Sequence, residues 1–171
     1  LSLTNDEKQK GVIAVSTGNH GKGVAFASSK LGIKSTIYMS KMVPQYRKEA
    51  IEALGANVEI YGSNSDEADM YAREISNKNN IPFIHPFDDE DVIAGQGTVG
   101  IEMLNDFPEV DTVIIPTSGG GLIGGIALAL KLQKPDIKVI AVSMERGPSM
   151  YESLKHGKPV DVEELETLAD C

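Results

Sequence analysis

The chain has 171 residues, of which 41% are hydrophobic, and a formal net charge of −9. This composition is ordinary for a folded protein with one good core or two smaller ones. The negative charge and the absence of Lys or Arg clusters argue against a nucleic-acid surface, so we expect no nucleic-acid partner. No run of about 18 apolar residues exists, so we expect no membrane span. The single cysteine, Cys171, fits a reducing compartment, and we expect a cytoplasmic protein.

Strand-like and helix-like segments alternate along the chain. Because a helix separates most successive strands, we expect βαβ crossovers and parallel sheets, so the expected fold class is α/β. In chain order we expect a strand at 12–16, a helix at 21–31, a strand at 33–39, a helix at 45–54, a strand at 58–61, a helix at 65–79, a strand at 81–84, a helix at 97–107, a strand at 112–115, a helix ending near 133, a strand at 137–143 and a helix at 148–156.

The pattern is interrupted in one place and looks incomplete at both ends. Pro86 and the acidic run 88–91 break the alternation, so we place a seam near residues 85–92. Residues 1–10 are expected to be the polar tail of a helix whose beginning is absent. Residues 165–171 stop without a terminating element. We therefore expect a piece of a longer protein.

A glycine-rich turn, Ser118-Gly119-Gly120-Gly121-Leu122, lies between an expected strand and an expected helix. Glycines allow positive φ angles and bring backbone N–H groups close to a ligand. The helix that follows adds unpaired N–H donors and a partial positive charge, so a phosphate or another anion is the favoured guest. The alternative is an ordinary tight turn packed against the sheet.

A second turn, Ser16-Thr17-Gly18-Asn19-His20-Gly21, also joins an expected strand to an expected helix. Its hydroxyl, amide and backbone donors can converge on a carboxylate or phenolate oxygen. Ordinary helix capping is the alternative. Open α/β sheets bind ligands at the carboxyl ends of their strands, so the two turns together predict a site for an anionic small molecule.

Five segments follow one another along the chain: Ser16-Thr17-Gly18-Asn19-His20-Gly21, Gly55-Ala56, His85-Pro86-Phe87-Asp88-Asp89, Ala94-Gly95-Gln96-Gly97-Thr98 and Ser118 to Leu122. In this order and at these separations they resemble the threonine/serine dehydratase and serine racemase family of fold-type II pyridoxal-phosphate enzymes. The resemblance runs from about Gly11 to the C-terminus.

The resemblance implies a three-layer αβα architecture like that of tryptophan synthase β, with a small closing domain at 11–88 and part of a large domain at 89–171. It implies pyridoxal 5'-phosphate as cofactor, an amino-acid substrate and a homo-oligomeric parent protein. The implied substrate-binding residues are Ser16, Thr17, Gly18, Asn19 and His20, with Asn19 also on the phenolic oxygen of the cofactor. The implied phosphate-binding residues are Ser118, Gly119, Gly120, Gly121 and Leu122.

Several departures from the family pattern bear on activity. The family's Schiff-base lysine and its pyridine-nitrogen partner match no position of this chain, and Lys22 is expected to be a surface group, so the chain alone should be inactive. Thr17 stands where similar serine racemases carry a catalytic serine; it is a possible catalytic residue, and its stiffer side chain favours elimination over racemisation. No metal is expected, because Ser143 and Ser149 occupy the cation-ligand positions and Glu145 is out of place.

The resemblance thus implies that the parent removes water from threonine or serine to give a 2-oxo acid and ammonia. Residues 143–147 also resemble a branch linked to hydroxyectoine breakdown, and a serine racemase-like enzyme stays open. A β-replacement synthase is disfavoured by Asn19-His20. A non-catalytic module that binds amino acids or anions is the remaining alternative. His20 itself is expected to be a positioning donor, with proton transfer as its other possible role.

Overall fold

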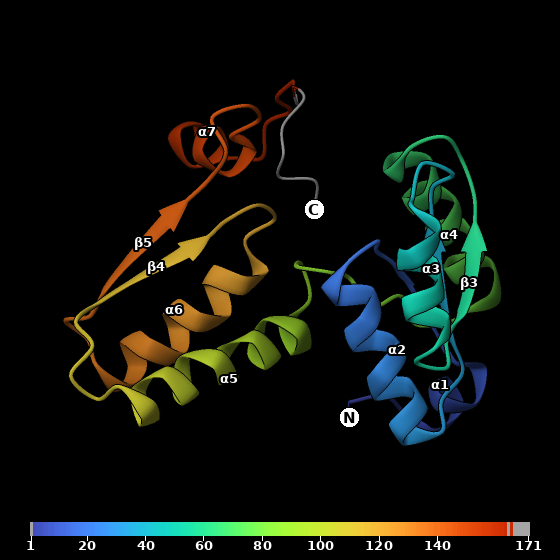
Figure 1. Ribbon diagram of the computed structural model, residues 1–171, viewed down its shortest axis with the longest axis horizontal. Helices are drawn as coiled ribbons and strands as arrows, with labels where there is room; N and C mark the ends of the chain where they lie inside the picture. The colour runs from blue at the N-terminus through green and yellow to red at the C-terminus, as the bar shows by residue number, and fades with distance from the viewer. Residues whose placement is uncertain (1, 164, 166–171) are drawn as a thin grey trace. The chain divides into compact units, whose positions relative to one another are not determined.

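The structure is a computed structural model, and it describes residues 2–163 and 165 (Figure 1). The elements are α1 (Asn5–Lys10), β1 (Val12–Val15), α2 (Asn19–Leu31), β2 (Ser35–Met39), α3 (Gln45–Glu52), β3 (Asn57–Ile60), α4 (Ser65–Asn79), α5 (Glu90–Asp106), β4 (Thr112–Pro116), α6 (Gly121–Gln133), β5 (Lys138–Val142) and α7 (Ser149–His156). The chain divides into two compact units between Pro86 and Phe87, which we call the first and the second unit.

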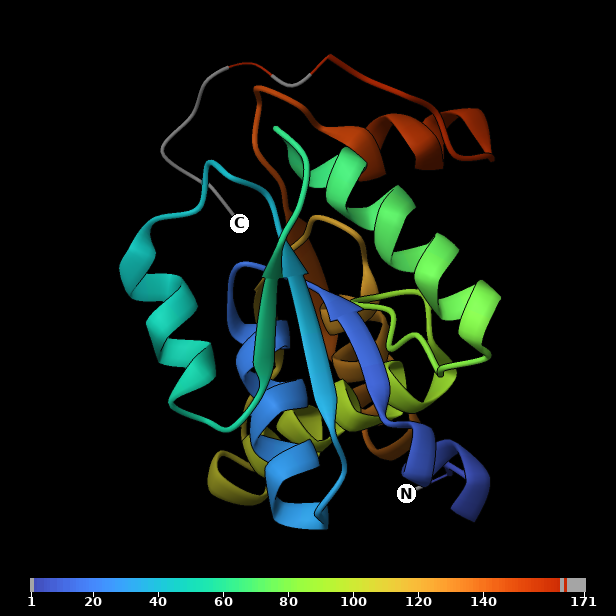
Figure 2. The same ribbon diagram turned by 90° about the vertical axis from the view of Figure 1, so that its right-hand side faces the viewer.

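The first unit is a three-layer αβα sandwich. Its sheet has the order β1-β2-β3 with both pairs parallel. Figure 2 shows the three strands side by side, with α4 on one side of the sheet and α2 and α3 on the other. The expected α/β class with parallel sheets is confirmed.

Each face of this sheet has its own core, because successive strand residues point to opposite faces. On the side of α2 and α3, Ile37, Met39 and Ile51 are fully buried. On the side of α4, the buried core residues are Ile13, Tyr38 and Ala72. The alternation of Ile37, Tyr38 and Met39 along β2 thus supplies both cores.

Two expectations for the first unit were wrong. The segment 81–84 is no regular strand: it makes one isolated parallel bridge, Phe83 to Ile13, flanked by hydrogen bonds from Ile13 N–H to Pro82 O and from Ile84 N–H to Ile13 O. Residues 2–10 also differ from the expected tail of a longer helix. Helix α1 has its own start, where Thr4 and Glu7 form a capping box that satisfies the first N–H groups.

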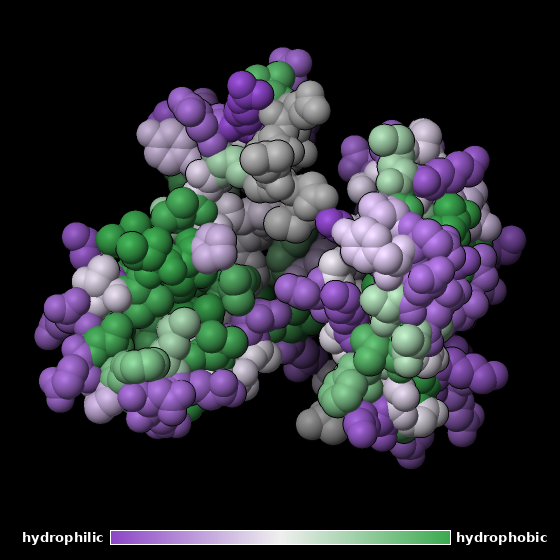
Figure 3. All heavy atoms as spheres, in the orientation of Figure 1, coloured by the Kyte–Doolittle hydropathy of each residue, from purple (hydrophilic) through white to green (hydrophobic). Residues whose placement is uncertain are grey.

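The second unit contains the parallel pair β4-β5, with α5 and α6 packed beneath it. Val113 and Ile115 of β4 are buried against Ile126 and Leu130 of α6. The opposite face of the strands is open among the described residues, and Ile114 is 66% exposed. Apolar residues accordingly gather over β4, β5 and α6 in Figure 3.

Helix α5 begins earlier than the sequence predicts. The expected start was residue 97, but the helix starts at Glu90, where the Asp89 side chain accepts a hydrogen bond from Val92 N–H (3.0 Å). The acidic run is therefore the first turn of a helix, where negative charge is favourable. Gly97 lies inside α5 and allows close packing against α6, because a Cβ there would approach Gly125 O to 3.2 Å.

Candidate functional site

The residue types singled out in the sequence lie at two strand-to-helix turns, one in each unit, and each turn is described by itself. The Ser16 turn comprises residues 16–20 and follows β1, and the glycine loop comprises residues 118–122 and follows β4. Both turns lie at the carboxyl end of a parallel strand, as predicted. That is the edge at which open α/β sheets bind ligands.

The Ser16 turn is shaped by its own hydroxyl and backbone. Ser16 N–H donates to Tyr38 O (3.3 Å), and Ser16 Oγ accepts from Gly18 N–H (3.1 Å). Gly18 is the N-cap of α2 and has no side chain to offer the first turn of the helix. The Ser16 hydroxyl thus bonds to the backbone of its own turn, a contact that the sequence did not predict.

His20 and Gly21 hold the start of α2 in place. His20 Nε2 lies 3.0 Å from Ile84 O, so the ring joins α2 to the segment after α4. A Cβ on Gly21 would lie 2.8 Å from Ile51 Cδ1 and 3.2 Å from Ser16 O, so a side chain there would require Ile51 and the turn to shift. Asn19 is exposed at the first helical position, Thr17 is half-buried, and Lys22 is exposed, as expected.

Only one of the three glycines in the glycine loop has a positive φ angle. Gly120 has φ +89°, whereas Gly119 and Gly121 are absent from the positive-φ residues. Glycine is needed at these two positions because Phe87 lies too close for a side chain. A Cβ on Gly119 would overlap the Phe87 ring, and one on Gly121 would lie 2.7 Å from Phe87 Cα. The sequence did not assign Phe87 any role at this loop; the signal was the surplus of glycines over what the turn itself needs.

The first turn of α6 offers backbone donors to a ligand. Its first helical hydrogen bond joins Gly124 N–H to Gly120 O (2.8 Å), so the N–H groups of residues 120–123 have no partner within the helix. Gly120, the N-cap, makes no side-chain cap. By contrast, α1, α4 and α5 are each capped by a side chain. These uncapped donors and the positive end of the helix dipole fit a phosphate group.

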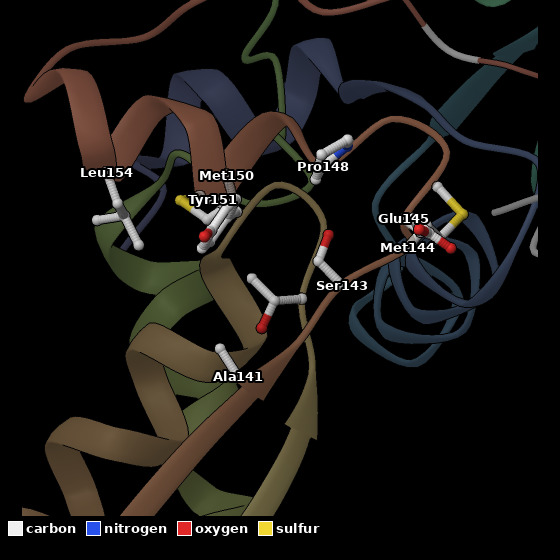
Figure 4. Close-up of a pocket in the computed structure, with 9 residues that line it drawn as sticks. Ala141, Ser143, Met144, Glu145, Pro148, Met150, Tyr151 and Leu154 are labelled. Atoms are coloured by element: carbon white, nitrogen blue, oxygen red, sulfur yellow. The ribbon is translucent and has the colours of Figure 1, made fainter.

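A cavity of about 320 Å³ lies beside the glycine loop in the second unit (Figure 4). Thr117 and Ser143, which follow β4 and β5, line it together with Met150, Tyr151 and Leu154 of α7. Met150 also reaches the loop, because its Cε would lie 2.7 Å from a Cβ on Gly120. Met150 therefore lies next to both the cavity and Gly120 of the glycine loop.

The cation positions considered in the sequence give no cluster of ligands. Ser143 and Glu145 line the cavity, and Ser149 is the first residue of α7. Within residues 2–163 and 165, no three His, Cys, Asp or Glu side chains lie together in a way that could hold a metal ion. In the same part of the chain, no helix is long and apolar enough to cross a membrane.

Two parallel strands, β1 and β4, are each followed by a turn and a helix without a side-chain cap, an arrangement that is typical of α/β proteins with anionic small-molecule ligands. The chain belongs to the family of pyridoxal-phosphate-dependent enzymes, and the sequence model of this family matches residues 1–171. It is 45% identical over 168 residues to the L-threonine ammonia-lyase of Thermotoga maritima. The aligned region covers 98% of this chain and 42% of that protein.

Two solved structures have the same fold over nearly the whole chain. Threonine deaminase isoform 2 of Solanum lycopersicum, in its processed form, superposes with a TM-score of 0.93 at 41% identity, covering 99% of this chain and 49% of that one. Maize serine racemase superposes with a TM-score of 0.92 at 32% identity, covering 99% and 51%. The chain thus spans about half the length of these relatives.

Proposed function

We propose that the full-length protein carrying this chain is a pyridoxal-phosphate-dependent ammonia-lyase that removes water from threonine or serine. The observation that carries the proposal is the uncapped glycine loop at the start of α6 in a chain 45% identical to an L-threonine ammonia-lyase. The products would be a 2-oxo acid and ammonia. The named relatives support threonine more directly than serine.

The glycine loop would hold the phosphate of the cofactor. Its N–H groups at residues 120–123 carry no partner in their own helix, and the dipole of α6 favours a negative charge at that end. Ser118 is exposed, so its hydroxyl is accessible as a further donor. The chemistry that pyridoxal phosphate supplies when bound is an electron sink for the α-carbon of an amino acid.

The Ser16 turn would bind the substrate carboxylate. Gly18 does not cap α2 by a side chain, so the first turn of this helix keeps donors for an anion. Thr17 and Asn19 add a hydroxyl and an amide to the same turn, and Asn19 would contact the phenolic oxygen of the cofactor. His20 would position the turn rather than transfer a proton, because its Nε2 is already engaged by Ile84 O.

We also propose that residues 11–88 form the closing domain and residues 89–171 part of the cofactor-binding domain, in a cytoplasmic homo-oligomer. The division of contacts between Pro86 and Phe87 supports two domains near this boundary. A serine racemase-like activity is the second candidate, favoured by the TM-score of 0.92 to maize serine racemase. Thr17 in place of serine speaks for elimination.

The test is product formation by the full-length protein. The protein is incubated with pyridoxal phosphate, and 2-oxobutyrate from L-threonine, pyruvate from L-serine and D-serine from L-serine are quantified. The proposal expects the oxo acids with an equal amount of ammonia. D-serine as the main product would replace the lyase by a racemase, and cofactor binding without any product would refute the proposed substrates.

A matched pair of glycine variants tests whether the glycine loop binds the phosphate of the cofactor. Gly120→Ala places a Cβ at a positive φ angle and against Met150, so we expect loss of cofactor affinity by about tenfold or more. Gly124→Ala lies four residues further along the same helix and meets no atom within 4 Å, so its affinity should stay unchanged. Equal affinities in the two variants would contradict phosphate binding at the loop.

A further inference from the structure

We propose that Phe87 is a positioning residue for the glycine loop: its ring and backbone fill the space that side chains at 119 and 121 would need, and thereby hold the loop in its phosphate-binding form. This inference rests on the proposed role of the loop. It assigns the glycines at 119 and 121 to a contact with another segment of the chain, and only the glycine at 120 to the conformation of the turn.

The contact is close on both sides of Gly120. A Cβ added at Gly119 would meet three carbons of the Phe87 ring, with Cε1 at 2.7 Å and Cδ1 and Cγ closer still. A Cβ added at Gly121 would meet the backbone of Phe87, with Cα at 2.7 Å and the carbonyl oxygen at 2.8 Å. Side chains are therefore excluded from 119 by the ring and from 121 by the backbone.

Backbone conformation gives no reason for glycine at these two positions. The positive φ angles in this region belong to Gly120 (φ +89°) and Gly147 (φ +118°). A residue with a side chain could adopt the backbone angles of 119 and 121, but it would have to displace Phe87. Gly119, Gly121 and Phe87 therefore depend on one another for their packing.

Phe87 lies two residues before Asp89, the N-cap of α5, and this helix packs along α6. Asp89 accepts from Val92 N–H at the start of α5 (3.0 Å). Further along, a Cβ on Gly97 would meet Gly125 O at 3.2 Å, and one on Gly100 would meet Ile126 O at 2.9 Å. Later residues of α5 thus contact later residues of α6, so the two helices run in the same direction.

The starts of α5 and α6 are thus joined by backbone-to-backbone packing, and Phe87 bridges them at the end where α6 offers its free N–H groups. Phe87 is 42% exposed, so part of the residue is covered by its neighbours and part faces solvent. A loop of glycines has little intrinsic preference for one conformation. The Phe87 contact supplies that preference before a phosphate arrives, and preorganisation of this kind raises affinity.

The first experiment compares two ligands on one variant of the full-length protein. Phe87→Ala removes the ring, and we expect the affinity for pyridoxal phosphate to fall by about tenfold while the affinity for pyridoxal, which lacks the phosphate, changes by less than about twofold. Both affinities are measured by titration of cofactor absorbance. Equal losses for the two ligands, or none, would overturn the inference.

The second experiment tests the contact itself by rescue. Gly119→Ala alone should lower both the unfolding temperature and the affinity for pyridoxal phosphate, because the new methyl group overlaps the ring. Adding Phe87→Ala should restore part of the unfolding temperature, whereas adding Met150→Ala, which removes the neighbour of Gly120 instead, should restore none. A loss that neither partner relieves, or that both relieve equally, would contradict the assignment.

The two hypotheses fail differently. If the unmodified full-length protein does not bind pyridoxal phosphate, the proposed function fails. If it binds the cofactor and Gly119→Ala is not rescued by Phe87→Ala, the proposed function stands and the role of Phe87 fails. The unfolding temperatures are measured without cofactor, so the rescue can be judged in either case.

Discussion

His20 Nε2 lies 3.0 Å from the carbonyl oxygen of Ile84, a residue 64 positions further along the chain. This bond connects the first turn of α2 to the segment that makes the single bridge with β1. The Ser16 turn is consequently anchored on both sides, by Tyr38 O at its start and by Ile84 O at its end. The turn that we propose as the carboxylate site is thereby held in one conformation.

Replacement of this histidine should affect stability first. We expect His20→Ala to lower the free energy of unfolding by about 1 kcal/mol, the usual net value of one hydrogen bond. His156→Ala is the control, because His156 Nδ1 bonds only to Glu152 O of its own helix at an exposed site. Denaturant unfolding measures both. A stable His20→Ala protein whose activity loses one limb of its pH profile would instead indicate proton transfer by His20.

The contact between α5 and α6 depends on glycine at position 125. A Cβ there would overlap Ile93 O and lie 2.8 Å from Gly97 N, both backbone atoms that cannot move aside. Gly125→Ala should therefore destabilise the protein by about 2 kcal/mol or more. Gly124→Ala meets no atom within 4 Å and should stabilise it by about 0.5 to 1 kcal/mol, since alanine is the better helix former.

Thermal unfolding of these two neighbouring variants is a sharp comparison, because the chemical change is identical. Opposite shifts of the unfolding temperature are expected. Shifts of the same sign would contradict the packing of α5 on α6.

Acid should weaken the start of α4 through Glu67. Hydrogen bonds from Ser63 N–H (2.7 Å) and Ser63 Oγ (3.0 Å) lower the pKa of this carboxyl below its usual value near 4.5. A carboxyl with a lowered folded-state pKa stabilises the protein above its unfolded-state pKa, and this contribution is lost as the pH falls through the folded-state pKa.

We therefore expect Glu67→Gln to unfold more easily than the unmodified protein at neutral pH, and the difference to shrink as the pH drops below about 4. Ser63→Ala removes the hydroxyl donor but keeps the backbone donor, so it should give an intermediate pH dependence. Unfolding temperatures between pH 3 and pH 7 measure the effect. A difference that stays constant over this range would exclude a role for the charge of Glu67.

The side chain at position 17 should influence the balance between elimination and racemisation in the proposed reaction. Thr17→Ser keeps the hydroxyl but removes the methyl group that restricts χ1. We expect the ratio of D-serine to pyruvate formed from L-serine to rise several-fold, and Thr17→Val, which lacks the hydroxyl, not to raise it. Chiral chromatography of the product mixture gives the ratio. An unchanged ratio in Thr17→Ser would remove Thr17 from the catalytic candidates.

Local sequence patterns predicted most of the elements but missed residues 90–96 of α5. Pro86 and the acidic run 88–91 were interpreted as a seam, and Gly95 lowers the intrinsic helix propensity just after it, so the pattern favoured a later start. The structure compensates for the glycines by packing, since Gly97 and Gly100 let the backbone of α5 approach α6. Similarly, residues 81–84 have strand-like composition but pair with β1 at one position only.

The sequence by itself determined the α/β class, the parallel strands and the two donor-rich turns, because apolar periodicity, capping residues and glycines act over a few neighbouring positions. Only the tertiary structure decided that His20 binds Ile84 O, that α5 begins at Glu90 and that Phe87 lies against Gly119. The contacts of His20 and of Phe87 join residues tens of positions apart, whose meeting is set by packing of whole elements, and the start of α5, although capped locally by Asp89, precedes glycines that are accommodated by packing on α6.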